Sequence, residues 1–199
     1  LDIHLLADGE IVVFHDEDLL RVTGNKGLLK NLTAEDLCQY TLAGSEETIP
    51  LLKDVLELVA GKVPLVIEIK NLKRIGKLEN QLLLLLKDYK GEVAIQSFNH
   101  LSLVWFRLKR PEIARGMLSS LNLGKLNLIK NSIVKNYLLY PLVAPTYIGH
   151  DVESLNSNIV GLLKKHCDIP LIAWTIKNEE QYQEILAYCE NIIFEGFRP

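Results

Sequence analysis

The sequence predicts an α/β protein of the TIM type, a (β/α)8 barrel whose first strand is absent from these 199 residues. One observation is that apolar, strand-like runs alternate regularly with helical patterns from residue 50 onward. Such alternation builds a parallel sheet through right-handed crossovers. A second observation is that no Gly-rich phosphate-binding fingerprint accompanies these runs, as it would in a typical dinucleotide-binding sheet. A closed barrel is therefore favoured over a doubly wound sheet.

The composition is that of an ordinary globular domain, with 48% hydrophobic and 24% charged residues. A net charge of −3 with scattered basic residues predicts no nucleic-acid partner. The longest leucine run, Leu82 to Leu86, is too short to span a bilayer, so no membrane segment is predicted. We expect one domain over residues 1–199, with a hairpin and an insertion at about residues 6–49. Oligomeric state and compartment stay open, with the cytoplasm slightly favoured.

The first 49 residues predict a hairpin followed by irregular chain. Asp8-Gly9 is a tight-turn signal between two strand-like runs, the second of which ends at His15. Antiparallel pairing of these runs brings Asp2 and His15 toward a common end. After a turn-rich loop, Thr33 caps a short helix.

From residue 50 the elements alternate. Pro50 opens a helix over 51–59, with Gly61 as its stop. The further strands are expected at 64–70, 92–98, 113–118, 142–147, 169–176 and 191–196. The further helices are expected up to Leu86, and at 101–109, 129–137, 152–166 and 179–188.

With the strand through Asp2 these make seven strands, and a barrel needs eight. Because the chain begins mid-strand, we expect the eighth upstream of Leu1. One edge of residues 1–5 would then pair in parallel with the strand ending at Glu68. The other edge would be left open for the missing strand.

Polar side chains gather at the predicted strand ends. Glu68 and Lys70 leave the same face of a buried strand, since they are two positions apart. Asp2 ends a neighbouring strand and the hairpin supplies His15. Carboxylates without a Cys or His pair suit a hard cation such as Mg²⁺ or Ca²⁺. Beside a lysine and a titratable histidine, such a cation is equipped for displacement at phosphorus. From the residues alone, a structural ion pair remains the alternative.

Several motifs in order then resemble the glycerophosphodiester phosphodiesterase family over essentially the whole chain. They are Asp2-Ile-His-Leu-Leu-Ala-Asp-Gly-Glu-Ile-Val-Val-Phe-His15-Asp16, Leu20-Arg21-Val-Thr23-Gly24, Ile49-Pro-Leu-Leu52, Glu68-Ile-Lys70, Gln96-Ser-Phe98 and Trp174-Thr175.

The resemblance implies a TIM-type barrel that hydrolyses glycerophosphodiesters to an alcohol and sn-glycerol 3-phosphate, with Mg²⁺ or Ca²⁺ as cofactor. Asp2 and Glu68 match metal ligands of the family. His15 matches a general acid/base, and Lys70 matches the lysine that contacts the phosphate. Trp174 matches a tryptophan at the barrel mouth that packs on the glycerol end. The partner implied is a small-molecule glycerophosphodiester, whose preferred head group the sequence does not specify.

The family's His-Arg-Gly strand and the first Glu of its Glu-x-Asp pair are absent from these residues. We therefore expect the 199-residue fragment itself to be inactive. One alternative is a barrel enzyme of the sphingomyelinase or phospholipase D type, although Cys38 has no obvious partner for the disulfide usual there. The other is a non-catalytic binding module.

Two further sets of residues are expected to have no role in the site. The cysteines are three and widely spaced, which predicts reduced thiols: Cys38, Cys167 and Cys189. Histidines in or beside helices and loops are expected at the surface: His100, His150 and His166. His4 is expected to be a partly exposed hairpin side chain.

Overall fold

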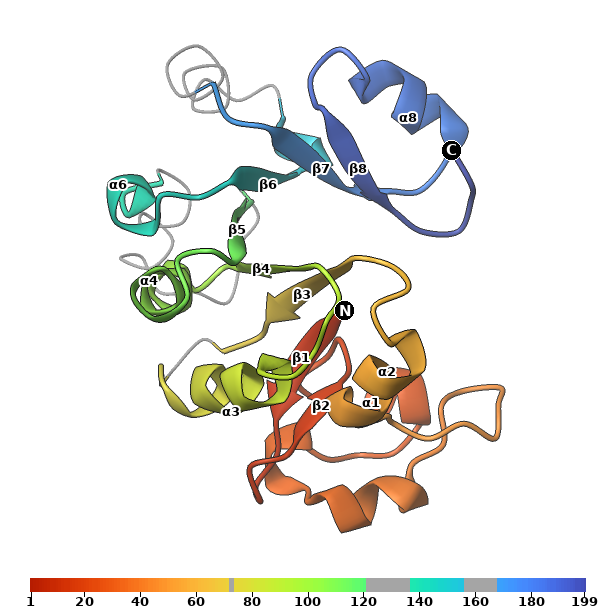
Figure 1. The fold of residues 1–199 in the computed structure, drawn as a ribbon. Coiled ribbons are helices and arrows are strands. Elements are labelled where there is room, and N and C mark those ends of the chain that lie inside the picture. Colours follow the sequence, from red (N-terminus) through yellow and green to blue (C-terminus); the bar gives the residue numbers. More distant parts are fainter. Residues whose placement is uncertain (72–73, 121–136, 156–167) are drawn as a thin grey trace. The chain divides into compact units, whose positions relative to one another are not determined.

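A computed structural model describes residues 1–71, 74–120, 137–155 and 168–199. The chain divides into two compact units, residues 1–95 and 96–199 (Figure 1). Strand β4 (Val93–Ser97) crosses the boundary between them.

The sheet of the first unit is built on β1 (Asp2–Leu5), which lies between β2 (Ile11–Val13) and β3 (Leu65–Ile69). β1 pairs antiparallel with β2 and parallel with β3. The predicted hairpin and the predicted parallel neighbour of residues 1–5 are both confirmed. The turn uses Gly9, whose φ of 94° lies in the region that glycine adopts without steric cost.

The predicted open edge of residues 1–5 is wrong, because β2 occupies it. Ile3, His4 and Leu5 pair there with Val13, Val12 and Ile11. The Phe14 amide extends this pairing by donating to the Asp2 carbonyl at 2.8 Å. On the other side of β1, the Glu68 amide donates to the Leu1 carbonyl at 2.7 Å.

The segment after the hairpin folds over its own apolar cluster. It contains α1 (Leu20–Thr23) and two 3-10 helices, η1 (Leu29–Asn31) and η2 (Ala34–Gln39). The helix predicted after Thr33 is η2, which begins with a capping box between Thr33 and Asp36. The buried members of the cluster are Leu6, Val12, Phe14, Leu19, Leu29, Leu37 and Ile49.

Two longer helices complete the first unit, α2 (Leu52–Val59) and α3 (Lys77–Leu86). α2 buries Leu52 and Leu56, one helical turn apart, and packs against β2. α2 ends at Val59 and is capped by Ala60, whose φ of 48° is left-handed, so the cap lies one residue before the predicted stop at Gly61.

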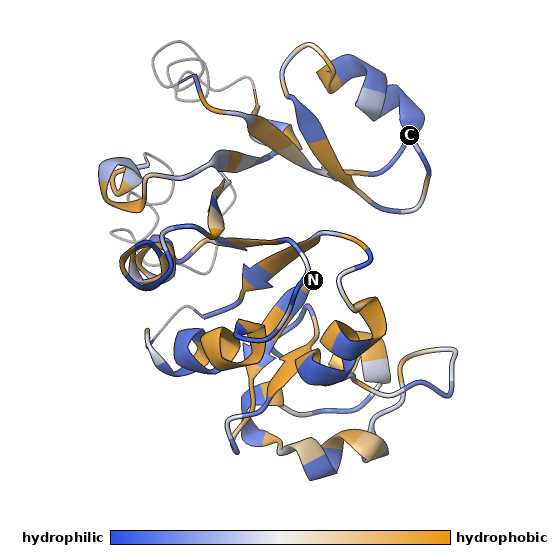
Figure 2. Cartoon of the chain, in the orientation of Figure 1, coloured by the Kyte–Doolittle hydropathy of each residue, from blue (hydrophilic) through white to orange (hydrophobic). Residues whose placement is uncertain are grey.

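In the second unit, neighbouring strands from β5 to β8 pair in parallel and in chain order. The strands are β5 (Ala114–Ser119), β6 (Tyr147–Asp151), β7 (Leu171–Ile176) and β8 (Asn191–Phe194). The helices are α4 (His100–Lys109), α6 (Tyr140–Val143), the 3-10 turn η3 (Val152–Ser154) and α8 (Glu179–Ile185). In both units apolar residues gather on strands and on one face of the longer helices (Figure 2).

The strand predicted at 142–147 is wrong, since the first part of that range is helical. α6 has a proline in its first turn and ends at Ala144, whose φ of 44° is left-handed. Pro145 has no backbone N–H, so it cannot donate one of the hydrogen bonds that join neighbouring strands within a sheet. Sheet pairing starts after it, where the Thr146 amide donates to the Arg115 carbonyl at 2.8 Å.

The expectation of surface histidines is also wrong for two of them. His100 is 2% exposed and His150 is fully buried. His150 Nδ1 lies 2.7 Å from the Tyr137 hydroxyl and its Nε2 lies 3.2 Å from the Ser154 carbonyl. Burial lowers the pKa of both histidines, which favours neutral rings in this core.

Several sequence expectations fall outside the described residues, including most of the helices at 129–137 and 152–166, together with His166 and Cys167. Cys38 and Cys189 are free thiols. Among the helices of the described ranges, none combines the length and apolarity that crossing a membrane requires.

Candidate active site

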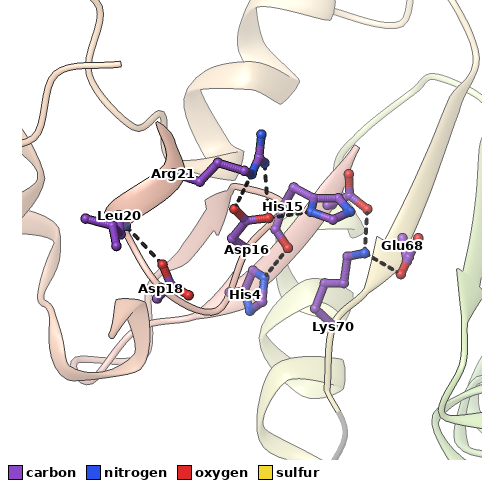
Figure 3. A network of polar contacts seen from close by, with 9 residues as sticks. His4, His15, Asp16, Asp18, Leu20, Arg21, Glu68 and Lys70 are labelled. Atoms are coloured by element: carbon purple, nitrogen blue, oxygen red, sulfur yellow. Dashed lines mark hydrogen bonds and ion pairs between the residues drawn. The ribbon is translucent and has the colours of Figure 1, made fainter. Parts of the chain in front are cut away.

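The predicted strand-end cluster exists in the first unit and is held together by one ammonium group. Asp2 on β1 lies directly opposite Glu68 on β3 in the parallel register. Lys70, just past β3, places Nζ 3.2 Å from Asp2 Oδ1. The same Nζ lies 2.7 Å from Glu68 Oε1 (Figure 3). The Lys70 amide donates to the Ile3 carbonyl at 3.2 Å, which fixes the turn that positions the side chain.

The charges in this cluster depend on one another. Burial raises the pKa of Glu68, and the nearby Lys70 only partly offsets that effect. Burial alone would lower the pKa of Lys70, but the charges of Glu68 and Asp2 outweigh it, so its pKa is raised. Lys70 is therefore a cation at neutral pH, and it neutralises part of the repulsion between the two carboxylates.

His15 is fixed by the residue that follows it. Asp16 Oδ1 lies 2.7 Å from His15 Nδ1. Arg21, on α1, donates from Nε to Asp16 Oδ2 at 2.6 Å and from its terminal nitrogen to Oδ1 at 3.1 Å (Figure 3). The side chain of His15 is 64% exposed, so its second ring nitrogen is accessible to a ligand.

Asp16 is a site residue to which the sequence argument gave no role. Hydrogen bonding from Arg21 lowers its pKa to about 2, and the hydrogen bond with His15 adds to this effect. The carboxylate therefore stays charged and can orient the imidazole through Nδ1. The signal was present in the sequence, because Asp16 and Arg21 both belong to the quoted motifs.

His4 is not the partly exposed side chain that was expected. It is 8% exposed, and its Nε2 lies 3.2 Å from the carbonyl of His15 (Figure 3). Burial lowers its pKa, so a neutral ring that donates from Nε2 fits this contact. His4 thus ties the backbone of His15 to β1.

Trp174 lies on β7 in the second unit. Its ring meets that of Phe98 edge to face, with centroids 5.5 Å apart. The indole Nε1 is buried and has no hydrogen-bond partner among the described residues.

The cluster fits a hard cation by its donor chemistry. Asp2 and Glu68 present carboxylate oxygens from adjacent, in-register strands. No group of three or more His, Cys, Asp or Glu residues suited to a metal occurs among the described residues. Two carboxylates are nevertheless sufficient for Mg²⁺, which commonly takes one or two and completes its shell with water and substrate phosphate.

Parallel strands that alternate with helices, with carboxylates, a lysine and a histidine grouped near strand ends, are typical of barrel enzymes that act on phosphate esters. The chain belongs to the glycerophosphoryl diester phosphodiesterase family, whose sequence profile matches residues 1–194. The fold is accordingly of the TIM-barrel type.

Named relatives agree with this assignment. The chain is 29% identical over 199 residues to a glycerophosphodiester phosphodiesterase of Caldanaerobacter subterraneus, covering 94% of this chain and 76% of the relative. It resembles the structure of an Oleispira antarctica phosphodiesterase in complex with the product sn-glycerol-3-phosphate. That likeness has a TM-score of 0.76 at 23% identity, over 97% of this chain and 78% of the other.

A glycerophosphodiester phosphodiesterase of Thermotoga maritima gives a TM-score of 0.73 at 24% identity, covering 98% of this chain and 79% of the other. At such identities the structural likeness establishes the fold.

Proposed function

We propose that the protein hydrolyses glycerophosphodiesters to an alcohol and sn-glycerol 3-phosphate, using a divalent cation and histidine acid/base catalysis. Family membership and the names of the relatives support the substrate class. The observation that carries the proposal is the shared contact of Lys70 Nζ with Asp2 and Glu68, beside the oriented His15.

Lys70 binds the phosphate in this proposal. Its raised pKa keeps the ammonium charged at neutral pH, so it can donate a hydrogen bond to a non-bridging phosphate oxygen and stabilise the negative charge there. Its side chain is 19% exposed, which limits competition from water. Positioning by two carboxylates holds Nζ in place before substrate arrives.

His15 moves the proton. Water attacks phosphorus, the bond from phosphorus to the alcohol oxygen breaks, and the leaving oxygen takes a proton. His15 gives that proton from Nε2, because Asp16 occupies Nδ1. The attacking water releases one of its protons to bulk water, and His15 takes a proton back from bulk water before the next turnover. Asp16 also stabilises the imidazolium that exists while the ring carries the extra proton.

Asp2 and Glu68 would hold the cation, either Mg²⁺ or Ca²⁺. Such an ion neutralises charge on the phosphate oxygens. Trp174 is proposed, on the family motif alone, to pack against the glycerol end of the substrate.

The direct test, made on the full-length protein, is metal-dependent release of glycerol 3-phosphate from sn-glycero-3-phosphocholine, measured after chelation and after adding back Mg²⁺ or Ca²⁺. Glu68→Gln keeps the shape and removes the charge, so turnover should fall by at least about a hundredfold with the fold intact. Glu57→Gln, on the exposed face of α2, is the matched control.

Full activity of Glu68→Gln at saturating metal would refute the metal assignment. Choline release from lysophosphatidylcholine or sphingomyelin, without hydrolysis of glycerophosphocholine, would instead indicate the phospholipase D type. Binding of glycerol 3-phosphate without turnover of any diester would indicate a binding module.

A further inference from the structure

A pocket of about 540 Å³ opens in the first unit next to the cluster of Asp2, Glu68 and Lys70. This volume lies within the range of small-molecule sites. Lys70 and His4 line the pocket. Lys70 also pairs with Glu68, and His4 also contacts the carbonyl of His15. A ligand bound at Lys70 can therefore extend into the pocket.

The pocket combines apolar walls with cationic side chains. Four leucines form the walls: Leu5, Leu28, Leu29 and Leu78. The remaining cations of the lining are Lys30, Arg74 and Lys77. None of these three side chains makes a hydrogen bond or ion pair with the described residues.

The charge balance in the pocket is positive. Glu17 is the one carboxylate of the lining within the described part of the chain. The lining carries four cations against Glu17, and when Asp2 and Glu68 beside Lys70 are added, one positive charge is still left in excess. Unpaired ammonium and guanidinium groups beside an apolar wall attract an anion more strongly than the same groups in open water.

The lining also disfavours a choline head group. Quaternary ammonium groups are usually held by aromatic faces, and the pocket lining among the described residues contains no Phe, Tyr or Trp. The positive excess would further repel them.

We propose that this pocket binds an anionic group, a phosphate or carboxylate, carried on the alcohol part of the diester. The enzyme would then prefer glycerophosphodiesters that carry a second negative charge beyond the scissile phosphate. The preference rests on the proposed function, whereas anion binding by the pocket can be measured without it.

A matched substrate pair tests the preference. sn-Glycero-3-phosphoglycerol and its 3′-phosphate differ only in the added anion. The phosphorylated substrate should have a kcat/KM at least about tenfold higher, as expected for a charged hydrogen bond. Combined Arg74→Gln and Lys77→Gln substitution should bring the ratio of the two values close to one. Lys62→Gln and Lys90→Gln, exposed lysines of the same unit outside the pocket, should leave the ratio unchanged.

Anion binding is followed separately by titrating isotope-labelled protein with inorganic phosphate and observing amide shifts. Saturable shifts at Lys30, Asn71 and Leu78 that disappear in the double variant support the proposal. Shifts that persist in the double variant, or equal shifts around Lys62, would overturn the proposal.

If no diester is hydrolysed but these shifts are found, the proposed function fails while the anion site stands. Equal kcat/KM for both diesters would overturn the preference.

Discussion

At the scale of single residues, His15 is the proposed proton carrier. General acid/base catalysis typically contributes a factor of ~10² to 10⁴. His15→Ala should therefore lower kcat toward glycerophosphodiesters by at least about a hundredfold. Steady-state kinetics separate the effects, since a rise in KM with unchanged kcat would mean that His15 only binds substrate.

Asp16, which orients His15, also makes the stability of the fold depend on pH. Because Arg21 lowers the pKa of Asp16 to about 2, the pair stabilises the fold above the ordinary carboxyl pKa, and this contribution is lost as pH falls toward 2. After allowance for solvent screening it amounts to roughly 0.5–1 kcal/mol. Asp16→Asn should lower the free energy of unfolding by about that much at pH 7 and by much less near pH 2.

Chemical unfolding at the two pH values measures the difference. Asp18→Asn is the control, because the carboxylate of Asp18 accepts a hydrogen bond from the Leu20 amide and pairs with no arginine of the described residues. A loss for Asp16→Asn that is equal at both pH values would show that the Arg21 pair contributes no pH-dependent stability.

At the scale of elements, close contacts between strands limit side-chain size. A Cβ at Gly116 on β5 would lie 2.2 Å from Cζ of Tyr147 on β6. The Tyr147 hydroxyl donates to Gln96 Oε1 at 3.1 Å, so the ring is not free to move away. Gly116→Ala should cost about 1–3 kcal/mol of stability by overpacking.

Urea unfolding checks this value, and a double variant identifies its cause. Tyr147→Leu removes the ring that the new methyl would meet, so adding it to Gly116→Ala should recover part of the loss. Purely additive losses in the two variants would place the cost in the backbone instead.

At the scale of the whole molecule, each compact unit has apolar residues of its own to bury. The cluster under the hairpin of the first unit includes Leu19, which is fully buried, while its neighbour Leu20 is 52% exposed. Leu19→Ala should lower the free energy of unfolding by about 2–5 kcal/mol. Leu20→Ala should change it by less than about 0.5 kcal/mol. Thermal or urea unfolding of the two variants compares them directly, and similar losses would mean that this cluster does not stabilise the unit.

The sequence alone determined the fold class, the alternation of strands and helices, and which polar residues gather at the strand ends. Alternating apolar runs and helical patterns are local properties, and family membership agrees with the barrel that they predicted. Glu68 and Lys70 could be placed on one face because strand side chains alternate with a period of two. The turn at Asp8-Gly9 likewise predicted that Asp2 and His15 would lie toward a common end, and the amide of Phe14, the residue before His15, donates to the Asp2 carbonyl.

Tertiary structure alone decided which polar residues are buried and where the pocket lies. His4 and His150 look like ordinary polar residues in the sequence. Their burial is made tolerable by hydrogen-bond partners from other parts of the chain, the carbonyl of His15 for His4 and the hydroxyl of Tyr137 for His150. The cationic pocket likewise brings together Lys30 and Lys77, far apart in the sequence. Such placements depend on the packing of non-neighbouring elements, which local periodicity does not encode.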